Sequence, residues 1–338
     1  MPNPISKNSD KSKSMPHSAI MRPVRPLAVL AIYIAVTLLV GALFAPWLYW
    51  LVQQHPGLFS VFGQFPFERF VHRSMLLFAI LGLWPLIWSL GFRSWADLGL
   101  VRPRDQWRKF LAGFLLGFFV LALVSAVVLI AQARTFSADV TAKALFVRVA
   151  IALCTGVVVA VIEETLFRGA VFGGLRKGFS WQTAAIISSV IFASLHFLGR
   201  AEHVGEVTPY SGAVMVPQML SGLINVEKTI PKFLNLVLVA LLLAFVYQRS
   251  GNLYLPIGLH AGGIAWIKLF KTLTVPVPGA ATALWGHAFV LDGWFAVAVL
   301  LVALAVAPRL MSFYLGLPPA DASARTGPMM RSQKNDPS

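Results

Sequence analysis

Two adjacent glutamates are unusual because they lie inside an apolar run, in the stretch 161–168 that reads VIEETLFR. A carboxylate at the centre of a membrane-spanning helix costs roughly 2.5–3.5 kcal/mol on insertion scales, so an acid in such a run points to a function. Two neighbouring carboxylates also oppose each other's ionisation. Glu163 and Glu164 are therefore the first candidates for acid–base chemistry.

Helical spacing separates the two acids. Glu164 and Arg168 are spaced i,i+4 with the acid first, the order that favours an ion pair on one face of a helix. We interpret them as a structural pair. Glu163 points about 100° away and has no cation on its own helix. Two interpretations stay open for Glu163: a solvated acid near the membrane interface, or a carboxylate that meets a partner from another helix.

Two histidines in other apolar runs are the candidate partners. The segment FASLH ends at His196, and His260 lies in the segment GLHAG. If the helices on either side of Gly178 form an antiparallel hairpin, Glu163 and His196 lie about 15 and 18 residues from the turn, within about one helical turn of the same depth. His260 lies only about eight residues from a turn at 249–252, so its depth fits less well. The spacing therefore favours a Glu163–His196 pair.

These residues lie in a chain whose composition is that of a membrane protein. Of its 338 residues 57% are apolar and only 12% are charged, against about half and about a quarter in soluble domains. A run of about 17–25 apolar residues can cross a bilayer. Eight runs reach or approach this length, over residues 27–52, 74–92, 110–133, 147–167, 181–198, 233–247, 253–270 and 284–307. We therefore expect an all-α polytopic membrane protein with about eight transmembrane helices in a single bundle.

The bundle covers residues 27–307, and the two ends of the chain differ from it in composition. Residues 1–26 and 308–338 combine Lys and Arg with Ser and Pro, which predicts disordered basic tails. Lys and Arg are also more frequent in alternate loops, which predicts a multi-pass protein of the cell (inner or plasma) membrane with both termini in the cytoplasm. We therefore interpret the net charge of +15 as determining how the protein is oriented in the lipid bilayer and how it contacts the bilayer surface. We expect no nucleic-acid partner.

The sequence lacks the motifs of several known enzyme and binding chemistries. The sequence has no His-Glu-x-x-His zinc motif, no Gly-x-Gly-Asp aspartate motif and no glycine-rich nucleotide loop. The single cysteine, Cys154, excludes a disulfide framework and a cysteine-rich zinc site. We therefore expect no cofactor.

Three motifs follow one another along the chain: EExxxR at Glu163–Arg168, FxxxH at Phe192–His196, and a later histidine, His260. In this order and spacing, each in its own apolar run, they resemble the CPBP family of intramembrane proteases. That family includes the CAAX endopeptidases that process prenylated proteins, and the bacterial abortive-infection, bacteriocin-processing and self-immunity proteins. The resemblance covers residues 146–270, about a third of the chain.

The resemblance implies a bundle of membrane helices with a hydrolytic site in a cavity, acting on a membrane-associated protein or peptide. Glu163 would be the general base that activates water, with His196 assisting, and His260 would stabilise the oxyanion. The catalytic group would thus be Glu163, His196, His260 and Glu164, with Arg168 and Phe192 as structural residues at the site.

One position departs from the family pattern. The family usually carries Asn or Asp four residues after its last histidine, and here that residue is Ile264. Isoleucine cannot donate a hydrogen bond. If that side chain normally serves the oxyanion, its loss costs on the order of 2.7–4 kcal/mol of transition-state stabilisation unless another donor replaces it.

Three functional hypotheses stay open, and the favoured one is a glutamic-type intramembrane endopeptidase that needs no metal. A metalloprotease would use Glu163, His196 and His260 as zinc ligands with Glu164 as base. Three ligands suit catalytic zinc, but two adjacent glutamates are not a usual ligand spacing. A non-catalytic immunity or transport-like membrane protein would use the same Glu/His cluster for proton coupling or partner docking, and Ile264 favours this third hypothesis.

Overall fold

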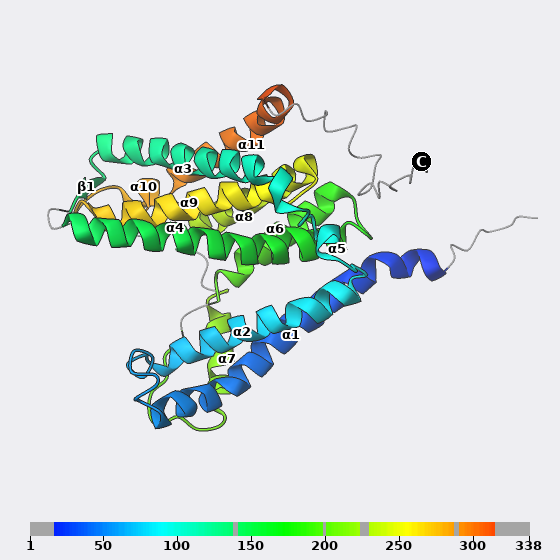
Figure 1. The fold of residues 1–338 in the computed structure, drawn as a ribbon, viewed down its shortest axis with the longest axis vertical. Coiled ribbons are helices and arrows are strands. Elements are labelled where there is room, and N and C mark those ends of the chain that lie inside the picture. Colours follow the sequence, from blue (N-terminus) through cyan, green and yellow to red (C-terminus); the bar gives the residue numbers. More distant parts are fainter. Residues whose placement is uncertain (1–16, 138–140, 199–200, 224–229, 287–290, 315–338) are drawn as a thin grey trace, which may run out of the picture.

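The computed structural model describes residues 17–137, 141–198, 201–223, 230–286 and 291–314, and these residues are mostly helical (Figure 1). Most of both predicted tails, residues 1–16 and 315–338, lies outside the described residues. The elements are α1 (His17–Gln54), α2 (Phe67–Ser89), η1 (Trp95–Leu98), η2 (Pro103–Asp105), α3 (Trp107–Ile130), β1 (Arg134–Phe136), α4 (Ala142–Glu164), η3 (Thr165–Phe172), α5 (Gly173–Leu175), α6 (Trp181–Leu195), α7 (Ser211–Ser221), α8 (Ile230–Ser250), α9 (Tyr254–Leu273), β2 (Thr274–Pro276), α10 (Thr282–Trp285) and α11 (Trp294–Tyr314).

Each of the eight predicted apolar runs overlaps a helix of the structure. Within the described ranges, six helices are long and apolar enough to cross a membrane: α1, α2, α3, the continuous helix Ala142–Leu175, α8 and α11. The other two runs form α6, which is apolar but only 15 residues long, and α9, which has 20 residues. The all-α polytopic membrane fold is thus confirmed.

Two helices begin earlier than their apolar runs. Helix α1 starts at His17, inside the segment predicted as a tail. Helix α2 starts at Phe67, ahead of the apolar part of the run. Its first turns are polar, and the guanidinium groups of Arg69 and Arg73 each lie 4.6 Å from the ring centre of Phe65. These cation–π contacts stabilise the polar end of α2.

The last helix begins later than its run, at Trp294 instead of 284, because a loop interrupts the apolar stretch. Gly286 in that loop has φ +84°, a conformation that favours glycine and ends the short helix α10. Helix α7 was not predicted, since residues 199–232 resemble a loop in composition. It packs on α1, where Gly212 lies against the carbonyl oxygen of Ala42.

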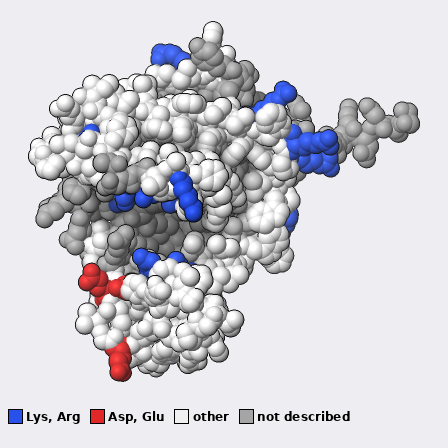
Figure 2. Space-filling model, turned by 60° about the vertical axis from the view of Figure 1, so that its left-hand side comes forward, with Lys and Arg blue, Asp and Glu red and all other residues white. Residues whose placement is uncertain are grey.

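The helices form two groups that meet at one end (Figure 1). Helices α3, α4, α6, α8, α9 and α11 lie together, while α1, α2 and α7 diverge from them. One apolar core joins the groups, with Leu30 of α1 and Ile87 of α2 packed beside Phe172 of η3 and Ala185 of α6. Figure 2 shows a largely uncharged face, hollowed between the two groups, with Lys and Arg side chains along the edges of the hollow.

Helix α9 packs between α3 and α4 at very close range. Gly258 and Gly262 lie against the carbonyl oxygens of Phe110 and Phe114 in α3. On the other side, a Cβ atom at Gly156 of α4 would lie only 2.6 Å from a carbonyl oxygen of α9. Glycines allow such approach between membrane helices, where van der Waals packing and Cα–H···O contacts replace the hydrophobic effect. The position of α9 is therefore set by backbone contacts on both sides.

The turn that precedes α9 is partly covered. Asn252 and Leu253 are both buried, and the amide of Leu253 donates to the carbonyl of Gly99 at 3.0 Å. The side-chain amide of Asn252 donates to Gln106 at 3.2 Å. Gly99 has φ +86°, which lets its loop fold back over this turn. The first residues of α9 therefore pack against the loop that carries Gly99 and Gln106, although Gly251 in the turn is exposed.

We expect Gly258→Ala to destabilise the protein and Gly263→Ala to be tolerated. At Gly258 the added methyl group meets backbone atoms of α3, which cannot move aside, so α9 must shift. At Gly263 it meets only Leu121 Cδ1 at 3.4 Å. The expected loss for Gly258→Ala is about 1–3 kcal/mol, measured by thermal unfolding of both purified variants in detergent. Equal melting temperatures would contradict the tight α3–α9 contact.

Candidate active site

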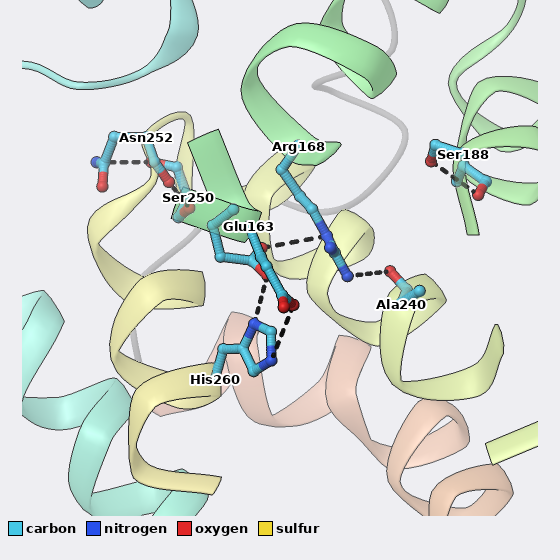
Figure 3. Close-up of polar contacts among 9 residues, drawn as sticks. Glu163, Arg168, Ser188, Ala240, Ser250, Asn252 and His260 are labelled. Carbon is cyan, nitrogen blue, oxygen red and sulfur yellow. Dashed lines mark hydrogen bonds and ion pairs between the residues drawn. The ribbon is translucent and has the colours of Figure 1, made fainter. Parts of the chain in front are cut away.

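The centre of the site is the carboxylate of Glu164, which is completely buried. One of its oxygens is 3.1 Å from Nε of Arg168, on the next turn of the same helix. The other accepts a hydrogen bond from Nδ1 of His260 in α9 at 2.7 Å (Figure 3). Glu164 thus forms an ion pair within its own helix and a hydrogen bond to α9, and a hydrogen bond that involves a charged group is stronger than a neutral one.

His260 is oriented by this contact. Because a carboxylate only accepts hydrogen bonds, the ring must carry a proton on Nδ1, and its Nε2 is directed elsewhere. Nε2 lies 3.8 Å from a carboxylate oxygen of Glu163 (Figure 3). The side chain of His260 is 12% exposed and that of Glu163 is 24% exposed. Of the two acids, Glu163 is therefore the one that a reactant can reach.

Arg168 is buried beside this pair and balances its charge. Its guanidinium lies 4.9 Å from the ring centre of Phe192 in α6, and one Nη donates to the carbonyl oxygen of Ala240 in α8 at 3.4 Å. With both glutamates ionised and Arg168 positive, the group of four is neutral when His260 is protonated. A neutral group costs far less to bury than one with net charge.

Phe192 connects this cluster to the second histidine. The ring centres of Phe192 and His196 are 4.3 Å apart, and those of Phe192 and His260 are 6.4 Å apart. Nδ1 of His196 bonds to the backbone carbonyl of Phe192 at 2.8 Å, which leaves Nε2 as the free nitrogen. His196 is exposed. It lies at the edge of the cluster, one aromatic ring away from His260.

The backbone changes immediately after the two glutamates. Residues Thr165–Phe172 form a π-helix inside the continuous helix Ala142–Leu175. Such segments are rare and often occur at functional sites, because the widened turn shifts the direction of the side chains that follow it. This segment carries Arg168, which is held against Glu164 from the first π turn. The π-helix was not predicted, because nothing in the residue types of this segment indicates it.

The structure brings together most of the expected residues, but with a different pairing. The predicted Glu164–Arg168 ion pair is confirmed. The side chain that faces Glu163 belongs to His260, whereas the spacing favoured His196. A count of residues from a turn does not say which helices pack side by side, and α9 packs directly on α4, where Gly156 lies against the carbonyl oxygen of Ala261.

One contact at the site was missed from the sequence: the carbonyl oxygen of Ala240 accepts from Arg168, and a backbone acceptor leaves no signal in residue type. Ile264, which was expected to lack a hydrogen-bond donor, is half-buried on α9 four residues after His260. Residues one helical turn apart share a face, so the hydrogen-bond donor on this side of the site is His260 itself.

The zinc hypothesis needs three ligands at one point. Among the residues that the structure describes, no three His, Cys, Asp or Glu side chains are grouped so that they could hold a metal ion. Glu163 and His260 are close, but the ring of His196 lies beyond Phe192. The predicted ligand set of Glu163, His196 and His260 is therefore not assembled in this structure.

Comparison with known proteins yields one match. Residues 145–264 match the family model described as type II CAAX prenyl endopeptidase, Rce1-like. The matched segment contains Glu163, Glu164, Arg168, His196 and His260. No curated protein and no solved structure is significantly similar to the chain.

We expect the two adjacent glutamates to differ sharply in their contribution to stability. Glu164→Gln leaves the buried Arg168 without its counter-charge, which should cost about 3–5 kcal/mol. Glu163→Gln removes an equal charge from a partly exposed site where the nitrogen of His260 is 3.8 Å away, and should cost less than about 1 kcal/mol. Thermal unfolding of the two purified variants makes the comparison. Similar losses for both would show that Glu164 is not the structural centre.

Proposed function

We propose that this chain is a glutamic-type intramembrane endopeptidase that cleaves a membrane-associated protein or peptide, a proposal supported by the match of residues 145–264 to the Rce1-like model of type II CAAX prenyl endopeptidases. The observation that carries the proposal is the orientation of His260. Its Nδ1 is held by the buried Glu164 while its Nε2 faces the accessible carboxylate of Glu163. A candidate general base, Glu163, and a hydrogen-bond donor, His260, thus lie side by side, and both are partly exposed.

In the proposed mechanism Glu163 is the general base. It removes a proton from a water molecule as the water oxygen attacks the carbonyl carbon of the scissile peptide bond. Protonated His260 donates from Nε2 to the carbonyl oxygen as negative charge develops there. The proton taken up by Glu163 then passes to the leaving nitrogen, so the products are a carboxylic acid and an amine. Such proton transfer contributes about 10²–10⁴-fold to the rate.

The surrounding residues support these roles by positioning. Glu164 fixes the ring of His260, and Arg168 neutralises Glu164 so that this carboxylate stays ionised beside Glu163. A preorganised donor stabilises an oxyanion without reorganisation during the reaction. His260 thereby supplies the hydrogen bond that Ile264 cannot. The exposed His196, with its free Nε2, would assist by contacting the water or the substrate at the edge of the site.

The glutamic mechanism is favoured over a metal-dependent one by the arrangement of donors. Within the described part of the chain, no three His, Cys, Asp or Glu side chains are grouped so that they could hold a metal ion. From the distribution of Lys and Arg along the sequence, we also propose a cell-membrane location with both termini in the cytoplasm.

We expect Glu163→Gln to abolish proteolysis while the protein remains folded and inserted. The amide has the size of the carboxylate but cannot take a proton from water, so activity should fall by about 10²–10⁴-fold. Quantitative proteomics of membrane fractions from cells with wild-type or Glu163→Gln protein should reveal a precursor that accumulates in the variant. That precursor then serves as the substrate for assays of purified protein.

Glu68→Gln is the matched control, because it removes one acid from the first turn of α2, outside the site. A chelator should leave wild-type activity unchanged. Turnover by Glu163→Gln at the wild-type rate would contradict the mechanism. Loss of activity in chelator that added zinc restores would favour the metalloprotease instead.

The two histidines provide a separate test of the pairing. We expect His260→Gln to reduce kcat more strongly than His196→Gln, because only His260 contacts both glutamates. His196→Gln should act mainly on KM or produce a smaller loss of kcat. The measurement is steady-state cleavage of the precursor by both purified variants, with thermal unfolding as the control for folding. The reverse order would restore the Glu163–His196 pairing that the sequence favoured.

A further inference from the structure

A cavity lies where the two groups of helices meet. Its volume is about 490 Å³, within the range of small-molecule sites. Three segments line it: Arg25 and Pro26 of α1, residues 89–91 at the end of α2, and Gly174 and Lys177 at the end of the continuous helix Ala142–Leu175. Figure 1 shows these segments together, with α5 beside α1 and the end of α2. Among the described residues of the lining, two are basic and none is acidic.

The ammonium group of Lys177 is held in place in the wall of this cavity. Its Nζ donates to the carbonyl oxygen of Leu90 at 2.6 Å and lies 3.8 Å from the ring centre of Phe92. Gly91 has φ +76°, and a Cβ atom there would lie only 3.3 Å from the same Nζ. The remaining N–H donors of the ammonium group stay available to a ligand. Because Lys177 is exposed and lines the cavity, a bound molecule can reach it.

The charges around Lys177 are mostly positive. Burial lowers the pKa of the Lys177 ammonium group, Asp97 raises it, and the guanidinium groups of Arg93 and Arg25 lower it further. The carboxylate of Asp97 already serves its own loop, since one oxygen accepts from the backbone amides of Arg93 at 2.7 Å and of Ser94 at 2.9 Å. Three cations thus share one carboxylate, and an anion bound between Arg25 and Lys177 would reduce their repulsion.

The cavity lies at the level of a membrane interface. Segments that are long and apolar enough to cross a membrane begin at Arg25 and end at Ser89 and Leu175, so three span ends meet here. Tryptophan is enriched at membrane interfaces, and three exposed ones lie around the end of α2: Trp84, Trp88 and Trp95. The guanidinium of Arg93 lies 5.2 Å from the ring centre of Trp88. This is the level at which lipid phosphate groups lie.

We propose that this cavity binds the phosphate of an anionic lipid headgroup. In the complex the phosphate lies between Arg25 and Lys177, and the hydroxyl of Ser89 donates to it. The planar fork of an arginine matches phosphate oxygens, and a lysine binds them as a point charge. With two cations and no acid among the described residues of the lining, the site prefers a headgroup with net negative charge over a zwitterionic one.

Bound lipid would join the two groups of helices. Arg25 belongs to α1, whereas Lys177 follows the helix that carries Glu163 and Glu164. No residue of the lining belongs to the proposed catalytic group, so the lipid site does not depend on the proposed protease activity. Glu163→Gln should therefore bind lipid as the wild type does.

Native mass spectrometry of the full-length protein in detergent tests the proposal, because it resolves each bound lipid by mass. The protein is titrated with phosphatidylglycerol and with phosphatidylcholine, and the apparent Kd of the first bound lipid is compared. Phosphatidylglycerol should bind more tightly, and its affinity should fall as salt is added. Arg25→Gln and Lys177→Gln should each weaken its binding about fivefold, the effect of one basic residue at a lipid surface.

Arg102→Gln is the matched control, since Arg102 is exposed in the loop that follows α2 but does not line the cavity. Arg25 is also exposed, so Arg25→Gln keeps the test valid should Lys177→Gln fail to fold. Equal binding of the two lipids, or wild-type affinity in Arg25→Gln, would overturn the proposal, and so would equal weakening by Arg102→Gln. Glycerol phosphate that binds as tightly as phosphatidylglycerol would overturn the assignment to a lipid.

Discussion

The buried carboxylate of Glu164 is the interaction on which the site depends. It has no exposure, so its charge must be matched inside the protein, and Arg168 and His260 match it from two different helices. Removing any member leaves a charge or a polar group without a partner in a region of low dielectric. The other side chains at the site take their positions from this contact: Phe192 lies against Arg168, and Glu163 faces the free nitrogen of His260.

This contact requires α9 to approach α4 closely. In a membrane, apolar side chains gain little by leaving lipid, so close packing must come from small residues and backbone contacts. Gly156 of α4 provides it, because it lies against the carbonyl oxygen of Ala261 in α9, while Gly258 and Gly262 bring the other side of α9 against α3. His260 directly precedes Ala261, so the contact that brings the two helices together also holds the histidine near Glu164. The packing of α9 on its neighbours and the position of His260 thus depend on the same short segment of α9.

The sequence predicted the local features of this protein well. Apolar runs located all six helices of the described residues that are long and apolar enough to cross a membrane, because a bilayer imposes a length and a composition that can be counted. The Glu164–Arg168 pair followed from the fixed geometry of a single helix. Prediction was weaker where composition was ambiguous. Helix α7 lies in a segment that resembles a loop, and the π-helix at Thr165–Phe172 has no recognised pattern in residue type.

By itself the sequence determined that this is a multi-pass helical membrane protein with a cluster of Glu, Arg and His side chains typical of one protease family. Only the tertiary structure decided which histidine meets Glu163. That choice depends on the packing of α9 on α4, where Gly156 lies against the carbonyl oxygen of Ala261, the residue after His260. Contacts within a helix follow from residue spacing, whereas contacts between helices follow from how the helices pack, which the spacing of residues does not encode.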